Sequence, residues 1–259
     1  MFKFTAHPTL QQQDHRPWPI PRGPWVMQQQ WHDLLFAHWP VEASALRPHI
    51  PAPLDIDTFE GKAWLGIVPF YMAHVKPRGC PSVPGLSFFP ELNVRTYVRY
   101  KDKPGVWFFS LEAGNPIAVE IARKGFHLPY FNARMHYEKR DDVYYFSERI
   151  HKNAPLAQFQ ARYAPISDVK LAQKDTLTHW LTERYALYSQ SASGQLYRGD
   201  IHHPPWPLQE AEAEFYKNNM LGDLPEDLVN VNSPPLLHFS QSISVVVWPL
   251  VKLSNARYK

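Results

Sequence analysis

The alternation of apolar and polar residues predicts that β-strands make up most of this chain. Short turn sequences such as EG, DKPG and SASG separate segments that alternate with a period of about two. Three hairpins are predicted, from residues 54–59 with 62–74, 91–101 with 106–112, and 132–138 with 143–150. Further strands are predicted at residues 25–39 (one strand or a bulged pair), 158–163, 186–189, 195–201, 206–216 and 236–250.

Three short helices interrupt the strands, and they are predicted at residues 41–46, 117–124 and 175–185. Gly125 is expected to end the second helix, and Pro129 lies shortly beyond it. The chain is then expected to enter a strand at Tyr130. Asp175 is the expected N-cap of the third helix. A helix that leads through a proline into a strand fixes the position of Tyr130.

Proline is the most unusual feature of the composition. The chain has 26 prolines and 11 glycines, which favours many short elements joined by rigid turns. The fold is therefore predicted to be mainly β, with a few short helices. Residues 1–24 are polar and proline-rich, and they are expected to form an extended, loosely attached arm. No repeat or long linker divides residues 25–259, so these residues are predicted to form a single domain.

The charge balance and the cysteine content restrict the classes of partner and compartment. The chain has 27 basic and 24 acidic residues, interspersed, with a net charge of +3. This argues against a surface for nucleic acid or membrane. The single cysteine, Cys80, cannot form an internal disulfide, which favours a reducing compartment. No secretory signal and no run of ~18 apolar residues is present. We therefore expect a cytoplasmic protein.

Candidate chemistry lies on the predicted strand that begins at Glu91. Alternation places Glu91, Asn93, Arg95 and Tyr97 on one face of that strand. One interpretation is a solvated face of a half-buried sheet. The other is the lining of a barrel mouth or cleft, where Arg95 would bind an anionic group while Glu91 orients it or acts as an acid or base. The sequence pattern leaves both interpretations open.

Motifs for metals, cofactors and common nucleophiles are absent from the sequence. It contains no HExxH, CxxC, GxSxG or GxGxxG motif and no P-loop. The neighbours His202 and His203 would point to opposite faces of a strand, so they cannot chelate one metal ion together. We therefore expect no metal and no cofactor.

Several segments together resemble a known family. They include LLFAHWPVEASALRPHIPAPLDIDTFEGKAWLGIVPF, FPELNVRTYV, GVWFFSLEA, ARKGFHLPYFNARM, LTERYALY and HHPPWPL. This combination resembles the YqjF-like family of uncharacterised proteins, which are distant relatives of acetoacetate decarboxylase. The resemblance implies a closed, antiparallel β-barrel of the acetoacetate decarboxylase type, with further strands around it and a few short helices.

The comparison with acetoacetate decarboxylase is informative because one residue departs from it. Aligned without gaps, Arg123 and Pro129 match the decarboxylase segment, whereas Tyr130 replaces the lysine that forms an imine with the keto acid. The resemblance places Glu91 at the pocket glutamate. A phenol with a pKa near ~10 cannot form an imine, so we expect no imine-dependent decarboxylation. Lys124 is either a substitute amine or a solvated lysine at a helix end.

Three functions remain open from the sequence. The first is binding of a small anionic or carbonyl-containing metabolite by Glu91, Asn93, Arg95, Tyr97, Arg123 and Tyr130, although Arg123 could equally be structural. The second is an enzyme acting on a carbonyl compound (a hydratase, an isomerase or a lactone-opening enzyme), with Glu91 as the base and Tyr130 as the acid or oxyanion donor. The third is an interaction module that uses Trp18, Trp25 and Trp206, which could instead hold the arm or support a homodimer.

Overall fold

The computed structural model describes residues 7–150, 154–221, 224–225, 228–229 and 233–254. These residues form thirteen strands, three α-helices and two 3-10 helices. The strands are β1 (Met27–Val41), β2 (Asp55–Ile56), β3 (Ala63–Pro77), β4 (Phe89–Tyr100), β5 (Lys103–Ala113), β6 (Tyr130–Lys139), β7 (Val143–Arg149), β8 (Gln158–Pro165), β9 (Ala186–Gln190), β10 (Leu196–His202), β11 (Leu208–Asn218), β12 (Leu236–Val247) and β13 (Val251–Lys252). The helices are η1 (Pro8–Gln11), α1 (Ala43–Leu46), η2 (Arg47–His49), α2 (Pro116–Phe126) and α3 (Leu177–Thr182). The prediction of a mainly β protein with a few short helices is confirmed.

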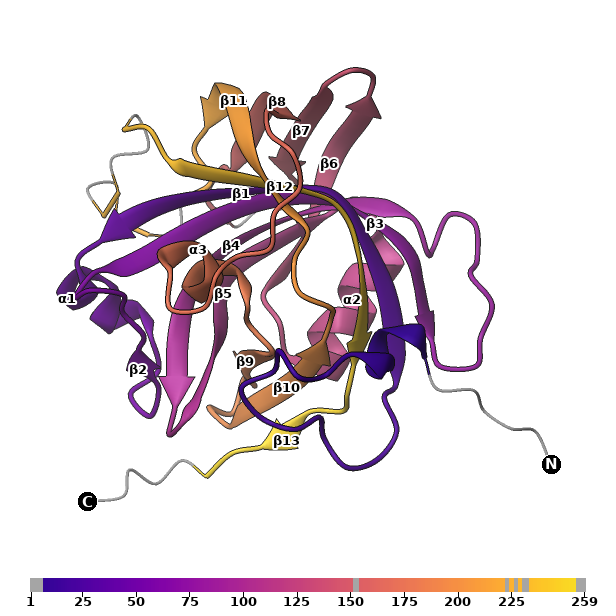
Figure 1. The fold of residues 1–259 in the computed structure, drawn as a ribbon, viewed down its shortest axis with the longest axis vertical. Helices are drawn as coiled ribbons and strands as arrows, with labels where there is room; N and C mark the ends of the chain where they lie inside the picture. Colours follow the sequence, from indigo (N-terminus) through magenta and orange to yellow (C-terminus); the bar gives the residue numbers. More distant parts are fainter. Residues whose placement is uncertain (1–6, 151–153, 222–223, 226–227, 230–232, 255–259) are drawn as a thin grey trace.

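The strand pairings close into two rings that share part of the sheet. One ring has nine strands, in the order β5, β6, β7, β8, β11, β12, β1, β3 and β4, and the pairing of β4 with β5 closes it. The other has seven strands, in the order β4, β5, β9, β10, β12, β1 and β3, and the pairing of β10 with β12 completes it. In Figure 1, β1, β12 and β3 run side by side across the upper part of the molecule. These strands belong to both rings.

Two pairings depart from the antiparallel arrangement that was expected. β5 runs parallel to β6 and also parallel to β9. The first of these pairings follows from the connection, because α2 carries the chain from the end of β5 back to the start of β6 in the manner of a β-α-β unit. This crossover brings Tyr130 next to Leu111, its partner on β5.

Side-chain alternation on β4 separates a packed interior from a hollow one. Leu92 and Val94 are completely or almost completely buried, and they belong to the main apolar cluster with Trp39 and Phe159. Residues at the alternate positions of β4 face the opposite side of the sheet, in the seven-strand ring. The strand that carried the candidate chemistry is therefore buried on both faces, and the interpretation as a solvated face is wrong.

The second and third predicted hairpins are confirmed, as β4 with β5 and β6 with β7. The first is wrong, because β2 pairs with β4 and not with β3. The predicted turn is present, since Phe59 and Lys62 bridge each other around it. However, Asp57 forms an ion pair at 2.6 Å with Arg99, which holds the segment against β4, and a second one at 2.6 Å with Arg184, between α3 and β9.

The helix ends differ from the prediction by a few residues. α2 continues through Gly125 to Phe126, and His127 terminates it with a left-handed conformation (φ 52°). α3 begins after Thr176, whose hydroxyl accepts from the His179 amide, and not at Asp175. Every helix in the described ranges is too short or too polar to cross a membrane.

The N-terminal segment is held to the domain through its described part. Arg16 donates from Nη1 to the carbonyl of Ile201 at 2.7 Å, and Trp18 lies 3.3 Å from Asp200. Thr9 contributes its carbonyl to a contact of 2.8 Å with His202. In Figure 1 this segment runs beside β10, which is inconsistent with a loosely attached arm. Residues 1–6 of the predicted arm lie outside the described residues.

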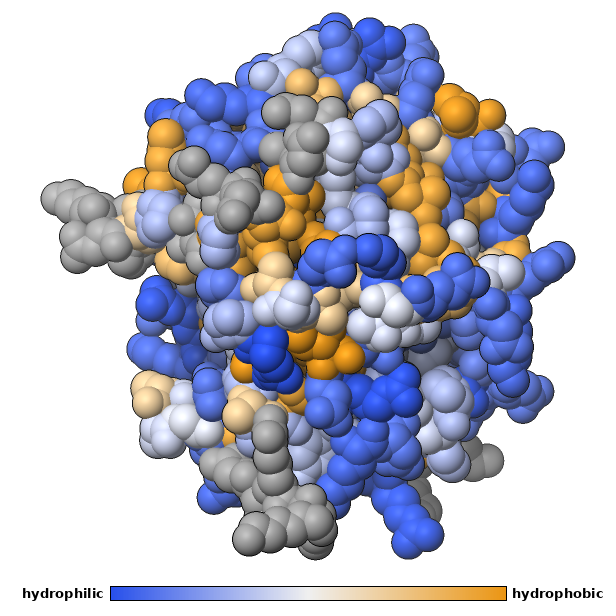
Figure 2. All heavy atoms as spheres, turned by 90° about the vertical axis from the view of Figure 1, so that its left-hand side faces the viewer, coloured by the Kyte–Doolittle hydropathy of each residue, from blue (hydrophilic) through white to orange (hydrophobic). Residues whose placement is uncertain are grey.

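On the side of α1 and β2, the surface is mainly hydrophilic, with hydrophobic areas near its centre (Figure 2).

Candidate functional site

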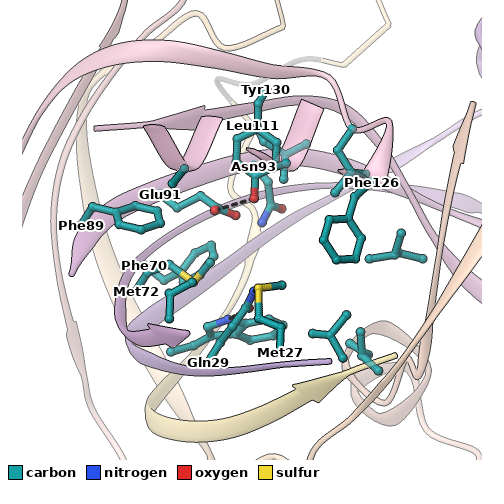
Figure 3. A pocket seen from close by; sticks show the side chains of 18 of the residues that line it. Met27, Gln29, Phe70, Met72, Phe89, Glu91, Asn93, Leu111, Phe126 and Tyr130 are labelled. Carbon is teal, nitrogen blue, oxygen red and sulfur yellow. Dashed lines mark hydrogen bonds between the residues drawn. The ribbon is translucent and has the colours of Figure 1, made fainter. Parts of the chain in front are cut away.

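All seven strands of the smaller ring contribute side chains to a cavity of about 370 Å³. Helix α2 and residues 80–87 border the same cavity. Figure 3 shows Glu91, Asn93 and Tyr130 directed into it, across from Met27 and Phe70. Most of the remaining lining is apolar, so the few polar groups define what the cavity can recognise.

Glu91 and Tyr130 form a buried hydrogen-bonded pair. The Tyr130 hydroxyl donates to Glu91 Oε2 at 2.8 Å, and the two residues are 9% and 3% exposed. The pKa of Glu91 is raised to about 8, mainly by burial; the hydrogen bond from Tyr130 opposes the rise, and the nearby Glu112 carboxylate adds to it. Burial and Glu91 together raise the pKa of Tyr130 well above its ordinary value. At neutral pH, Glu91 is therefore mostly protonated and Tyr130 is a neutral hydrogen-bond donor.

A second buried carboxylate, that of Glu112, lies near this pair. It is not among the site residues predicted from the sequence. Glu112 Oε1 accepts from Arg149 at 2.6 Å, and both side chains are almost completely buried. Ser110 donates to the other Glu112 oxygen at 3.2 Å. The negative charge of Glu112 is thus neutralised by Arg149. Because the two residues are 37 positions apart in the sequence, no local spacing could have revealed them as partners.

Arg95 forms the second polar group of the cavity. It is 8% exposed, and its guanidinium lies 5.2 Å from the ring centre of Phe36 and 5.7 Å from that of Tyr97. Its Nε atom is buried, and it has no hydrogen-bond partner among the described residues. No acidic side chain in the described ranges lies within ion-pair distance of Arg95. Asn93 Oδ1, on the same face of β4, is also buried, and the part of the chain that the structure describes offers it no hydrogen-bond partner.

Gly66, the neighbour of Arg95 on β3, leaves space for the ring of His38. A Cβ atom at Gly66 would lie 3.0 Å from His38 Cδ2 and 3.5 Å from Arg95 Cγ. Tyr97 does not line the cavity, but its hydroxyl accepts from Arg95 Nη2 at 3.4 Å. Its hydroxyl is 2.6 Å from His38 Nε2, and the Arg184 guanidinium lies 4.8 Å from its ring centre. Tyr97 therefore supports the position of Arg95.

Arg123 and Lys124 lie apart from the other candidates. Arg123 is on the last turn of α2, 3.7 Å from Glu120, and lines a separate surface pocket beside His127. The Lys124 side chain is 82% exposed and 3.4 Å from Glu120. The structure thus brings Glu91, Asn93, Arg95 and Tyr130 together around one cavity, with Tyr97 behind them, and it does not bring Arg123 to that cavity.

The apolar walls are the part of the site that the sequence analysis missed. Trp206 had been considered as a surface contact, but it is 2% exposed and stacks on Trp31 with ring centres 5.9 Å apart. Both tryptophans line the cavity. Strand periodicity could place such aromatic residues inside the fold, but it could not separate a cavity wall from a packed core. In the part of the chain that the structure describes, no group of three or more His, Cys, Asp or Glu residues could hold a metal ion.

The family follows from sequence comparison. Residues 28–244 match DUF2071, a family of uncharacterized conserved proteins. The chain is also 49% identical to the uncharacterized protein YqjF of Bacillus subtilis (strain 168) over 240 residues, which cover 91% of this chain and 96% of YqjF. The chain belongs to the DUF2071 family.

Solved structures with the same fold are much more distant in sequence. The enduracididine biosynthesis enzyme MppR, complexed with the condensation product of pyruvate and imidazole 4-carboxaldehyde, matches with a TM-score of 0.60 and 11% identity, covering 91% of this chain and 92% of MppR. An acetoacetate decarboxylase matches with a TM-score of 0.57 and 14% identity, covering 96% and 98%. An acetoacetate decarboxylase-like enzyme from Sphingomonas wittichii RW1 matches with a TM-score of 0.58 and 12% identity, covering 93% and 98%. This DUF2071 chain therefore has an acetoacetate decarboxylase-like fold.

Proposed function

We propose that this protein binds a small anionic or carbonyl-containing metabolite in the cavity, without forming an imine. The single observation that supports this is Arg95, a buried guanidinium that faces the cavity and has no acidic partner in the described ranges. Removing a cation from water is costly unless an anion or several acceptors compensate for it. A carboxylate in the cavity would compensate Arg95 with paired hydrogen bonds from the guanidinium fork. In this proposal, the seven-strand ring acts as a closed barrel around the ligand.

The chemistry of the cavity argues against imine-dependent decarboxylation. Tyr130 occupies the position that the resemblance assigns to the imine-forming lysine, and a phenol cannot form an imine with a carbonyl compound. Lys76, at the border of the cavity, is the one lysine among its described lining residues. Lys124 is exposed on α2. The fold neighbours include a decarboxylase and a pyruvate-bound enzyme. Because their sequence identity to this chain is low, the similarity supports a shared fold and does not support a shared reaction.

A thermal-shift screen tests the binding proposal. The panel contains small keto acids, carboxylates, lactones and aldehydes, and each compound is measured with the wild type, Arg95→Ala and Arg123→Ala. A ligand that binds only the folded state raises the melting temperature by mass action. We expect carboxylates or keto acids to stabilise the wild type and Arg123→Ala, and to lose this effect in Arg95→Ala. No shift with any anion, or the same shift in all three proteins, would contradict the proposal.

Acid–base catalysis on a carbonyl compound is the second candidate function, and the Glu91–Tyr130 pair supports it. A pKa of about 8 places Glu91 near the range where a carboxyl group can exchange protons at physiological pH. Glu91 would act as an acid below this pH and as a base above it, while the Tyr130 hydroxyl would stabilise a developing oxyanion.

The test of this candidate uses any compound from the screen that is also turned over. The hydrogen bond from Tyr130 lowers the pKa of Glu91, so Tyr130→Phe should move the Glu91 limb of the pH–rate profile to higher pH. Glu91→Gln should abolish turnover and leave binding intact. Turnover that survives in Glu91→Gln would exclude this mechanism.

A further inference from the structure

The entrance of the cavity has an unusual surface. Four large apolar residues there are exposed: Ile117 (55%) and Ile121 (62%) on α2, and Val83 (45%) and Leu86 (38%) on the loop before β4. Single exposed apolar residues are ordinary on protein surfaces. These four residues border one cavity from two sides, and such a grouping is typical of a surface that contacts an apolar molecule.

The apolar character continues from this entrance into the cavity. The lining residues along the way are mainly large and apolar, and include Met27, Trp31, Phe70, Met72, Phe126 and Val247. Figure 3 shows Met27, Phe70 and Phe126 around the open space. A very small, strongly polar acid would leave most of this wall without a matching surface.

The order of residues along β4 places the charged group at the far end from the entrance. Phe89 begins β4 next to the entrance loop, Glu91 and Asn93 follow, and Arg95 comes last. Four residues of a strand span about 13 Å, so Glu91 and Arg95 are well separated. The Arg95 guanidinium also donates to the hydroxyl of Tyr97 at 3.4 Å, and Tyr97 lies farther along β4 from Glu91. If a ligand binds Arg95 through its charged group, the rest of the ligand can extend along the apolar lining as far as the entrance.

We propose that the natural ligand is a monocarboxylate with an extended apolar chain, its carboxylate at Arg95 and its chain directed to the entrance between α2 and the loop of Val83. This inference rests on the proposed function and specifies its ligand class. Glu91 and Tyr130 then lie beside the chain and not beside the carboxylate. A keto or hydroxyl group on the chain is the ligand group that this pair would bind.

Isothermal titration with straight-chain acids tests the proposal. The probes are acetate, butyrate, hexanoate, octanoate and decanoate, each used below its micelle concentration with the full chain. Each buried methylene should strengthen binding up to about fourfold, until the chain reaches the entrance. The primary alcohol that matches each acid should bind more weakly, because it lacks the charge that pairs with Arg95.

Substitutions at Arg95 and at Ile121 test separately how the carboxylate and the chain end of the ligand bind. Arg95→Ala should weaken every acid at least tenfold, and Arg95→Met, which keeps much of the side-chain volume, provides the same test if the alanine variant folds poorly. Arg123→Ala is the matched control and should bind like the wild type. Ile121→Ser should weaken decanoate and leave butyrate unchanged.

Each outcome decides between the two proposals. Binding of short acids through Arg95 with no gain from longer chains would overturn the apolar-chain inference and leave the proposed function intact. Binding that is lost in Lys76→Ala and kept in Arg95→Met would overturn the orientation, because the carboxylate would then lie at the entrance. Absence of binding by every straight-chain acid would overturn the apolar-chain inference, whereas the proposed function is overturned only if the keto acids and other anions of the thermal-shift panel also fail to bind.

Discussion

The chemistry of Glu91 depends on its burial more than on its partners. The side chain is 3% exposed, and its pKa rises to about 8 although the Tyr130 hydroxyl donates to it at 2.8 Å. Desolvation disfavours the charged carboxylate more strongly than one hydrogen bond from a neutral phenol can stabilise it. Glu112 has a different environment, because it forms a buried ion pair with Arg149. Of the two buried glutamates, only Glu91 has a neutral phenol as its side-chain partner.

The raised pKa of Glu91 predicts how the stability of the protein depends on pH. Glu91 titrates near 4.5 when unfolded and near 8 when folded, so between these pH values the folded protein binds a proton that the unfolded chain has lost. The contribution of Glu91 to the free energy of unfolding should therefore fall by roughly 1.4 kcal/mol per pH unit across this window. Glu91→Gln resembles the neutral acid and should remove this dependence.

Urea denaturation of both proteins at several pH values measures the effect. The difference in unfolding free energy between Glu91→Gln and the wild type should be small near pH 4.5 and should increase in favour of the variant up to pH 8. A difference that is constant over this range would show that Glu91 titrates normally in the folded protein.

At the scale of elements, Asn115 links helix α2 to the entrance loop. Its Oδ1 accepts from the amides of Ile117 and Ala118 at 3.1 and 3.2 Å, which caps the helix. Its Nδ2 donates to the carbonyls of Gly85 and Leu86 at 3.0 and 3.2 Å. One buried side chain therefore holds together the two segments that border the cavity.

Two substitutions separate these functions of Asn115. Asn115→Ala should destabilise the protein by about 1–2 kcal/mol, because it removes the cap and leaves buried groups unpaired. Asn115→Asp keeps an oxygen that caps the helix but lacks the amide donors to Gly85 and Leu86. Hydrogen exchange should show lost protection in both α2 and the loop for Asn115→Ala. For Asn115→Asp, the loss should be confined to the loop. Equal protection of α2 in wild type and Asn115→Ala would contradict the capping role.

Element predictions from the sequence succeeded where local signals were decisive. Turns and alternation located the hairpins β4–β5 and β6–β7, because each depends on residues that are close in the chain. The pairing of β2 with β4 brings Asp57 next to Arg99, which is 42 residues away. The parallel pairing of β5 with β6 required the direction in which α2 returns the chain. Such long-range contacts leave no periodic signal.

For the whole molecule, alternation on β4 predicted that Glu91, Asn93 and Arg95 share a face. It did not predict which side of the sheet is hollow, because packed and empty interiors are lined by the same types of apolar residue. The resemblance to acetoacetate decarboxylase suggested Arg123 as a site residue. In the structure that residue lies on an exposed turn of α2, 3.7 Å from Glu120. The sequence therefore supported a site on β4 better than one on α2.

The two rings divide the molecule into a packed part and a hollow part. The nine-strand ring contains the main apolar cluster, and the seven-strand ring contains the cavity. β1, β3, β4, β5 and β12 belong to both rings, so the apolar face of each shared strand supports the face that lines the cavity.

Isothermal titration of butyrate into the wild type, Arg95→Met and Arg123→Ala is the most direct test of anion binding at Arg95. We expect saturable binding at one site in the wild type and in Arg123→Ala, and at least a tenfold loss of affinity in Arg95→Met, with all three proteins folded by circular dichroism. Equal affinity in the three proteins, or binding that depends on Arg123 and not on Arg95, would contradict this expectation.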